Sequence, residues 1–365
     1  MVRTLPVARV MVVVLLVGLA QVPAPARARV GETSVMTRNL YLGADLTPVI
    51  AATTPQGFFQ AVAQVLGTIS STNFPERAAA LAREIAEKRP HLVGLQEVFQ
   101  FTLNGNTGAP PFRDLLEDLL SALAAEGADY YVVGQVRNLD VTIPVPGLGL
   151  VRAMGRDVVL VRGDVPASIV AVPGCRVSQE GCNYEVFAPL PSLAGPINSE
   201  RGFLVVDATV DGQALRFVNT HLEIPELPRV VQAAQASELI VRLDAIAQPG
   251  LPVVIVGDIN SAPTDGDVIT PGGVIGSPYR QFTTAGYADV WQLRPGKSAG
   301  LTCCQLNDLL NAESELFKRV DVILARAVLT DVHATVVGNE PDDRTPSGLW
   351  PSDHAGVVAR LQFGY

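Results

Sequence analysis

The chain has 365 residues, of which 48% are hydrophobic and 17% are charged, and its formal net charge is −9. This composition excludes disordered and fibrous proteins and provides for a large buried core, in one big domain or two. The acidic balance argues against bulk attraction to polyanions, so any phosphate chemistry needs a local cation.

The N-terminus has the three parts of a secretory signal peptide. Arg3 and Arg9 precede an apolar run from Val10 to Ala20, and the A-x-A site Ala26-Arg27-Ala28 follows it. The run is too short to span a bilayer. We therefore expect residues 1–28 to be removed on secretion, leaving residues 29–365 with a formal charge of −12, since the three lost charges are arginines.

In chain order, helical and apolar patterns first predict a strand over 34–40, a helix over 77–88, a strand over 91–98 and a helix over 112–125. Strands follow over 156–162, 202–210 and 214–223, and then a helix over 228–247. The last predicted elements are strands over 251–260, 319–325 and 355–363. Alternating helices and apolar strands of this kind predict an α/β layered domain. No internal repeat interrupts the pattern.

Polar side chains follow or begin several of these strands. They are Asn39, Glu97, His221, Asp258, Asn260, Asp321, Asp353 and His354. If neighbouring strands bring these positions to one rim, the rim collects carboxylates, amides and imidazoles that suit a divalent metal and a phosphate.

The ordered motifs TRNL, LQEV, NTHLE, GDIN, RVDVIL and SDH, spread over about 39–354, resemble the endonuclease/exonuclease/phosphatase superfamily of deoxyribonuclease I-like, metal-dependent phosphoesterases. The resemblance implies a four-layer α/β/β/α sandwich with its site on one edge of two packed sheets. It also implies that residues 29–365 form one catalytic domain.

By resemblance, Glu97 is the principal metal carboxylate, helped by Asn39 and, through water, by Asp353. The implied ion is Mg²⁺, with Mn²⁺ or Ca²⁺ as alternatives. Mg²⁺ prefers oxygen ligands and usually keeps several waters, so one or two carboxylates are enough.

The remaining motif residues take catalytic roles by resemblance. Asp258 orients or deprotonates the attacking water, and Asn260 steadies a phosphate oxygen; on an extended segment, residues two apart point the same way. His221 donates a hydrogen bond to the phosphate. His354 is the second catalytic imidazole, held by Asp321, because an acid behind an imidazole fixes its tautomer and stabilises its charged form.

Other polar residues have less specific signals. His91 and His333 lie outside the motifs and are expected to be ordinary surface or hydrogen-bonded residues. Asp157 and Arg201 are second-tier candidates for the site, and neither is assigned as catalytic. An Arg before a strand is as compatible with a surface charge as with a phosphate clamp.

Two apolar features each leave two interpretations open. The segment from Asp140 to Leu150, rich in Pro and Gly, favours ordinary hairpin packing over an exposed flap that touches lipid or substrate. Trp350 is compatible with a core position or with stacking on a base or headgroup.

Four cysteines in an exported chain predict disulfide bonds, and they allow three pairings. Pairing Cys175 with Cys182 would close a short loop and contribute about 2.5 kcal/mol, leaving the adjacent Cys303 and Cys304 as the second pair. Structural cross-links are favoured over a metal site, because no histidine lies within ligand spacing of either pair in the sequence.

Together these features predict a secreted, monomeric Mg²⁺-dependent phosphodiesterase that uses an activated water. Nucleic acid is the first substrate class; the alternative is a lipid headgroup, as in sphingomyelinase-like enzymes, with transient membrane contact. A third hypothesis is an exported binding protein that keeps the fold with little turnover. Loops, and not the shared core, choose among these substrates.

Overall fold

A computed structural model describes residues 31–103, 112–147, 149–190 and 197–364. The predicted signal peptide lies outside these ranges, and its removal stays a prediction. Within them, no helix is long and apolar enough to cross a membrane.

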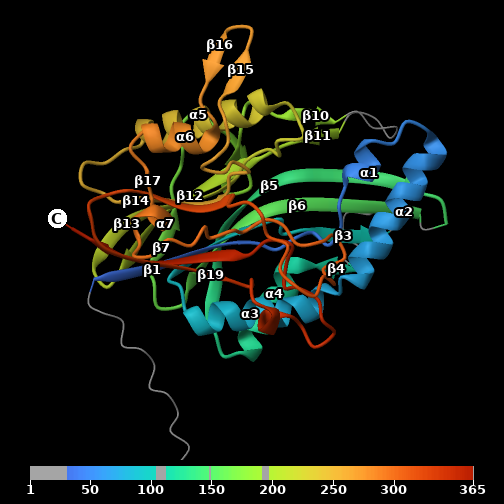
Figure 1. Cartoon of the computed structure of the whole chain (residues 1–365), viewed down its shortest axis with the longest axis horizontal. Coiled ribbons are helices and arrows are strands. Elements are labelled where there is room, and N and C mark those ends of the chain that lie inside the picture. The colour runs from blue at the N-terminus through green and yellow to red at the C-terminus, as the bar shows by residue number, and fades with distance from the viewer. Residues whose placement is uncertain (1–30, 104–111, 148, 191–196, 365) are drawn as a thin grey trace, which may run out of the picture. The chain divides into compact units, whose positions relative to one another are not determined.

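Two large mixed sheets form the middle of the structure (Figure 1). The first has the order β19-β20-β1-β2-β6-β3-β4, with β5 also paired to β6. Its strands are β1 (Glu32–Asn39), β2 (Leu92–Gln96), β3 (Gln100–Leu103), β4 (Arg113–Asp114), β5 (Tyr130–Val145), β6 (Gly149–Arg162), β19 (Leu329–Val337) and β20 (Gly356–Phe363).

The second sheet has the order β17-β18-β14-β13-β12-β9-β8, with β7 also paired to β12. Its strands are β7 (Ala167–Ile169), β8 (Arg176–Ser178), β9 (Gly181–Asn183), β12 (Gly202–Val210), β13 (Gln213–His221), β14 (Val253–Asp258), β17 (Ala288–Asp289) and β18 (Asp321–Arg326). Two small hairpins pair β10 (Ala188–Leu190) with β11 (Ile197–Ser199), and β15 (Val268–Thr270) with β16 (Gly273–Ile275).

The described part of the chain has seven α-helices and one short 3₁₀ helix, and the last α-helix places Val290 and Trp291 between the two sheets instead of on an outer face. The helices are α1 (Thr47–Ile50), α2 (Pro55–Ser71), α3 (Phe74–Lys88), α4 (Leu115–Ala125), α5 (Arg229–Ala245), α6 (Pro278–Thr284), α7 (Val290–Leu293) and the short 3₁₀ helix η1 (Pro341–Asp343). In the view of Figure 1, α3 and α4 lie below the strands and α5 and α6 above them.

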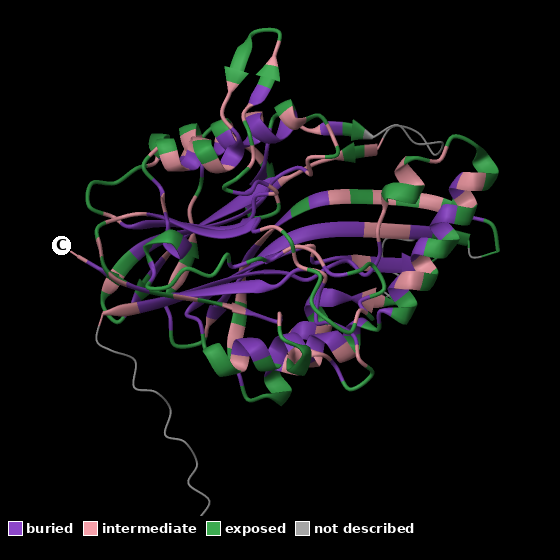
Figure 2. Ribbon diagram, in the orientation of Figure 1, coloured by how far each residue is buried: buried purple, intermediate pink, exposed green. Residues whose placement is uncertain are grey.

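Three apolar layers hold this arrangement together. Leu81 and Leu119 of the lower helices pack on Val93 of the first sheet, and Leu239 of α5 packs on Ile255 of the second. Between the sheets lies a third cluster, which explains why the central strands are buried on both faces (Figure 2). The result is the α/β/β/α sandwich, which confirms the predicted fold class.

The three predicted helices and eight predicted strands are present, with shifted ends. The helix predicted from residue 112 begins at Leu115, because the Asp114 carboxylate caps it by accepting a hydrogen bond from the Leu116 amide at 3.0 Å. The Asp140–Leu150 segment belongs to the β5–β6 hairpin, as favoured. Trp350 is a core residue, fully buried, with its indole nitrogen donating to the Asn311 carbonyl at 2.8 Å.

Among the elements of nine residues or more, the pattern missed α2, β5 and β19, and it also missed most of the shorter strands and helices. Along β5 and β19, many positions are exposed or half-buried, so their sequences lack the continuous apolar runs of the central strands. Helix α2 contains Gly67 and three hydroxyl residues among its buried apolar positions, which weakens its helical pattern.

Two disulfide bonds join Cys175 to Cys182 and Cys303 to Cys304. Both match the pairing proposed from the sequence. The first ties β9 to the segment before β8. The second lies in the connection between α7 and β18, beside the candidate site described below.

Buried His91 should make the folding stability of the protein sensitive to acid. Its side chain is 4% exposed and its Nδ1 accepts a hydrogen bond from the Ser34 amide at 2.9 Å. Burial, aided by the nearby Arg162, lowers its pKa to about 4. The exposed His333, 3.3 Å from the Asp331 carboxylate, is a matched surface control.

Because the unfolded chain binds the His91 proton more tightly than the folded chain, stability is complete above about pH 6.5 and falls as the pH drops toward 4. His91→Gln should therefore shrink the loss of unfolding free energy between pH 7 and pH 4 by about 3 kcal/mol. Urea unfolding at both pH values measures it. An unchanged pH dependence, equal to that of His333→Gln, would contradict this account.

Candidate active site

The register of the second sheet places three predicted site residues side by side. His221 at the end of β13 pairs with Asp258 at the end of β14, and Asp258 pairs with Asp321 at the start of β18. Gly257 makes this close approach possible, because a Cβ at that position would collide with the Thr220 carbonyl of β13. The glycine of the GDIN motif therefore serves the spacing of the site.

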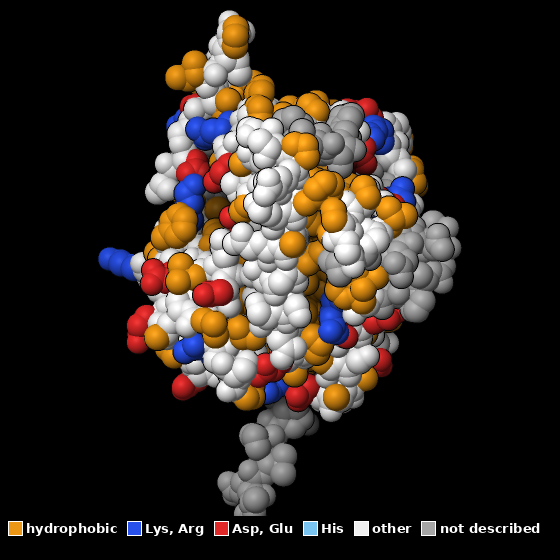
Figure 3. Space-filling model, turned by 90° about the vertical axis from the view of Figure 1, so that its right-hand side faces the viewer, with side chains coloured by type: hydrophobic (Ala, Val, Ile, Leu, Met, Phe, Trp, Pro, Cys, Tyr) orange, Lys and Arg blue, Asp and Glu red, His pale blue; other side chains and the backbone are white. Residues whose placement is uncertain are grey.

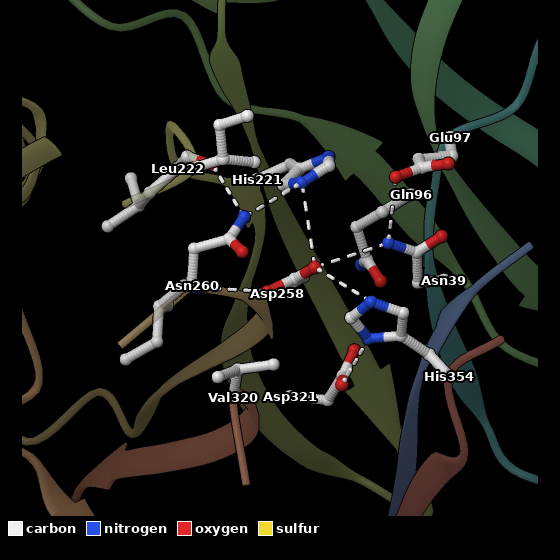
Figure 4. A network of polar contacts seen from close by, with 12 residues as sticks. Asn39, Gln96, Glu97, His221, Leu222, Asp258, Asn260, Val320, Asp321 and His354 are labelled. Atoms are coloured by element: carbon white, nitrogen blue, oxygen red, sulfur yellow. Dashed lines mark hydrogen bonds and ion pairs between the residues drawn. The ribbon is translucent and has the colours of Figure 1, made fainter. Parts of the chain in front are cut away.

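The first sheet contributes Asn39 and Glu97 from the ends of β1 and β2 (Figure 4). The Asn39 amide nitrogen lies 3.3 Å from Glu97 Oε1 and 3.2 Å from Asp258 Oδ2, so it bridges the two sheets. The second Glu97 oxygen accepts a hydrogen bond from the Leu42 amide at 3.0 Å. Glu97 has a left-handed backbone (φ 56°), which turns it out of the strand direction.

A buried amide pair locks the sheets together behind these residues. Gln96 Nε2 donates to Asn219 Oδ1 at 2.7 Å, and Asn219 Nδ2 donates to the carbonyls of Leu95 and Val158 at 3.0 Å. Gly94 leaves the room for it, since a Cβ there would meet the Asn219 side chain. The two strand ends are thus held at a fixed separation.

The loop carrying Asp353 and His354 is fastened to the same edge. The Ser352 hydroxyl donates to the Asn39 carbonyl at 2.8 Å, and the Arg38 guanidinium donates to the His354 carbonyl. The buried Arg77 guanidinium donates to carbonyls on both sides of the site, at Leu40 and Pro351. All eight predicted site residues therefore come together at one edge of the sandwich.

His354 lies between two carboxylates. Its Nδ1 is 2.8 Å from Asp321 Oδ2, and its Nε2 is 3.7 Å from Asp258 Oδ2. Burial alone would lower its pKa, but the charges of Asp321, Asp258 and Asp353 outweigh burial and raise the pKa well above its usual value. This environment favours the protonated imidazolium, in which Nδ1 donates to Asp321.

His221 has the opposite environment. Its side chain is buried, and Arg201 Nη1 lies 3.0 and 3.1 Å from its two ring nitrogens. Burial first, and then the Arg201 charge, lower the His221 pKa well below its usual value. Since a guanidinium only donates hydrogen bonds, it requires an unprotonated ring nitrogen, and His221 is neutral. The two imidazoles are thus distinguished electrostatically.

Three carboxyl groups of the site are harder to ionise than usual. Burial raises the pKa of Asp258 to about 6 and those of Asp157 and Asp353 to about 7. For Asp258 and Asp353, neighbouring carboxylates raise the pKa further while His354 lowers it. The site therefore carries more acid than its own cations neutralise.

Asn260 reaches the site by a different geometry from the one predicted. Strand β14 ends at Asp258, and Asn260 has a left-handed backbone (φ 51°), so the two residues do not lie on one extended segment. Instead, Asp258 Oδ1 accepts a hydrogen bond from the Asn260 amide at 2.9 Å, closing a turn. The Asn260 side chain lies 3.3 Å from His221 Nε2 and donates to the Leu222 carbonyl.

The donor atoms suit a hard divalent cation beside Glu97. Glu97 and Asp353 are half-buried and line the same cavity, and the Glu97 charge raises the Asp353 pKa. Asn39 turns its nitrogen toward Glu97, while its oxygen accepts from the Tyr41 amide at 3.0 Å and keeps a second lone pair for an ion. Carboxylate and amide oxygens are the ligands that Mg²⁺ prefers.

A second group of metal-type donors consists of Asp258, Asp321 and His354, whose ligand atoms lie within 4.8 Å of one another. The imidazole already bridges the two carboxylates, with a hydrogen bond to Asp321. We therefore interpret this group as a proton-bearing acid–imidazole–acid arrangement, which leaves Glu97 and its neighbours as the residues that could hold an ion.

The site opens into a cavity of about 260 Å³. Its apolar wall is formed by Leu42, Leu46, Ile50, Phe99, Leu139, Ile224 and Leu227. Its carboxylates are Asp45, Glu97, Asp157, Glu200, Glu223 and Asp353, and its arginines are Arg156 and Arg201. Both arginines pair with carboxylates, at 2.6 Å from Asp114 and 3.0 Å from Glu223.

Arg201, Asp157 and Glu223 also lie at the site; the first two were second-tier candidates without a role, and Glu223 was not a candidate. Asp157 Oδ1 is 3.9 Å from His221 Nδ1, and Arg201 connects His221 to Glu223. Strand pairing is what brings Arg201 to the site, because its neighbour Gly202 pairs with His221 in the sheet. Nothing in the local sequence of Arg201 reveals that pairing.

Comparisons with known proteins agree with this geometry. The model of the Endonuclease/Exonuclease/phosphatase family matches residues 65–354. The chain belongs to this family. No curated protein matches it.

Several solved structures share the fold. An endonuclease/exonuclease/phosphatase from Beutenbergia cavernae is 21% identical, with 91% of this chain and 72% of that chain covered and a TM-score of 0.54. A family protein from Leptotrichia buccalis is 18% identical, with 91% and 100% covered and a TM-score of 0.52. TDP2 from Caenorhabditis elegans is 16% identical, with 91% and 75% covered and a TM-score of 0.50. At these identities the likeness shows the fold alone.

Replacing His354 by Ala should lower turnover of a cleavable phosphodiester by roughly 10²–10⁴-fold, the usual contribution of a positioned acid–base group, while the fold survives. Asp321→Asn should give a smaller loss. The double variant should be no slower than His354→Ala, because Asp321 acts through the imidazole. Steady-state rates at saturating Mg²⁺ measure this.

The matched control is the surface pair His333 and Asp331, whose His333→Ala and Asp331→Asn variants should keep full activity. Full activity in His354→Ala would break the predicted site. Losses that multiply in the double variant would separate Asp321 from His354.

Proposed function

We propose that the chain is a secreted, metal-dependent phosphodiesterase that hydrolyses its substrate with an activated water. The observation that carries the proposal is the set of eight motif side chains at one edge of the sandwich, with a charged and a neutral imidazole on either side of Asp258. Three of the eight, Glu97, His221 and Asp353, line the cavity. An intact arrangement of this kind favours turnover over the alternative of an exported binding protein.

Asp258 is the group best placed to orient and deprotonate the water. Its pKa near 6 leaves it mostly ionised at neutral pH, yet more basic than an ordinary aspartate. The Asn39 amide holds the same oxygen, Oδ2, that faces both imidazoles. The water proton passes to this carboxylate as the water oxygen bonds to phosphorus and the opposite P–O ester bond breaks.

Both imidazoles lie on the side of the attacking water. His221 Nε2 is 3.6 Å and His354 Nε2 is 3.7 Å from Asp258 Oδ2. Since attack is in line, the leaving oxygen lies on the far side of phosphorus from Asp258. His354, as a cation, and His221 and Asn260, as neutral donors, therefore stabilise charge on the non-bridging oxygens.

Glu97, Asn39 and Asp353 would hold a divalent ion, which would supply positive charge to the reacting phosphate when bound. We propose Mg²⁺ as this ion, with Mn²⁺ or Ca²⁺ as alternatives.

The cavity favours a lipid-headgroup diester over nucleic acid. Six carboxylates and two arginines line the cavity, and both arginines already form ion pairs with carboxylates. The further phosphates of a nucleic acid would therefore find little positive charge there. On the face shown in Figure 3, Lys and Arg side chains are scattered among acidic ones and form no continuous stripe among the atoms described. A single phosphate with an apolar or cationic group suits the apolar and acidic walls better.

A substrate panel tests this proposal. The mature enzyme should cleave sphingomyelin or phosphatidylcholine in vesicles with a kcat/KM at least about tenfold above that for DNA or RNA, equivalent to about 1.4 kcal/mol. Chelation should abolish cleavage, and Mg²⁺ should restore it. Asp258→Asn should be inactive, while Asp342→Asn, at an exposed acid of η1, should keep full activity.

A preference for DNA or RNA would reject the lipid assignment and keep the phosphodiesterase. Cleavage that persists in Asp258→Asn or in excess chelator would reject the mechanism. No cleavage of any member, including a p-nitrophenyl phosphodiester, would favour the binding-protein hypothesis.

A further inference from the structure

The Cys303–Cys304 pair lies against the catalytic edge. The Cys304 sulfur is 3.7 Å from His354 Nε2, the ring nitrogen that faces Asp258. Although no histidine is near these cysteines in the sequence, the fold brings His354 to them across 50 residues. The ligand atoms of Cys303, Cys304 and His354 lie within 4.8 Å of one another.

Backbone hydrogen bonds hold the two segments together independently of the sulfur bond. Cys303 forms a bridge with His354 and another with Lys318. On either side, the Ala355 amide donates to the Thr302 carbonyl at 2.8 Å, and the Gln305 amide donates to the Asp353 carbonyl at 2.8 Å. Opening the disulfide therefore leaves both sulfurs beside the imidazole. Both cysteines are half-buried, so a small reductant can reach them.

We propose that the reduced pair forms, with His354 Nε2, a binding site for a soft metal ion such as Zn²⁺, and that occupation of this site switches off the His354 side of the catalytic centre. Two ligands on a tetrahedral zinc, at about 2.3 Å for sulfur and 2.0 Å for nitrogen, are about 3.5 Å apart. The observed separation of 3.7 Å between Cys304 Sγ and His354 Nε2 fits this value.

The chemistry separates this site from the hard-metal site at Glu97. Thiolates and imidazole select zinc or cadmium, whereas carboxylate and amide oxygens select Mg²⁺. A dithiol reductant supplies two electrons and two protons, becomes a disulfide itself, and leaves two thiols. Zn²⁺ then binds both sulfurs as thiolates, which releases the two thiol protons. It also binds His354 Nε2 once that nitrogen has lost its own proton. His354 no longer presents Nε2 to Asp258 or to a phosphate.

For an exported enzyme, the redox state of the Cys303–Cys304 pair would differ between the cytosol and the exterior. In a reducing cytosol the pair would be open and able to capture zinc, and in an oxidising exterior it would be closed. The site would hold the enzyme inactive before export. This inhibitory role rests on the proposed function, whereas metal binding by the reduced pair does not.

Cadmium is a suitable probe because its thiolate complexes absorb in the near ultraviolet. Reduced mature protein should bind one Cd²⁺ with a charge-transfer band, and oxidised protein should show none. Cys303→Ser/Cys304→Ser should lose the band, while Cys175→Ser/Cys182→Ser, which lacks the other disulfide, should keep it. His354→Ala should keep thiolate absorption and weaken binding by at least roughly tenfold, the lower end of the cost of losing a supporting metal partner. No band in the reduced protein, or a band that survives loss of both Cys303 and Cys304, would overturn the site.

An activity measurement tests the inhibitory role. In reduced enzyme with excess Mg²⁺, one equivalent of Zn²⁺ should abolish turnover, and reoxidation with zinc removed should restore it. Cys303→Ser/Cys304→Ser should resist the same zinc, which excludes inhibition at the Glu97 site. Cadmium binding without loss of turnover would keep the metal site and reject its inhibitory role. Inactivity of the oxidised enzyme before any zinc is added would count against the proposed function instead.

Discussion

The site depends on one electrostatic constraint: several carboxyl groups are held at a partly dry edge where they cannot all ionise without counter-charge. Asp157, Asp258 and Asp353 all have raised pKa values for this reason. Within the described chain, Arg201 offsets the charge of Asp157, His354 that of Asp258, and His354 with Arg77 that of Asp353. His354 and Arg201 are already engaged with acids. The excess negative charge beside Glu97 is what makes a divalent cation a natural component of the site.

The sandwich holds these groups together against their repulsion. Strand register fixes His221, Asp258 and Asp321 in a row, and buried amide hydrogen bonds join this row to the ends of β1 and β2. Because both sheets are anchored by apolar cores, the free energy of packing holds the like charges close. The same environment divides the imidazoles into one cation and one neutral donor, a division that the motifs alone leave open.

Much of the fold and the membership of the site followed from sequence because apolar runs end in polar motif residues. The sequence left Arg201 as a candidate without a role, and it could not provide the left-handed turn at Asn260, since both depend on how β12, β13 and β14 align. Edge strand β19 was not predicted because many of its positions are half-exposed, so its sequence mixes polar and apolar residues. The neighbourhood of Cys304 and His354 is likewise a product of tertiary structure, as their separation of 50 residues hides it.

The central claim is that Glu97 holds a divalent cation at this edge. Calorimetric titration of Mn²⁺ into the mature protein tests it without any substrate. We expect one site in the wild type, weakened by more than roughly tenfold in Glu97→Gln, since even supporting partners of a metal contribute that much. Glu117→Gln, at an exposed position of α4, should bind as the wild type does. Equal Mn²⁺ affinity in Glu97→Gln and the wild type would contradict the account.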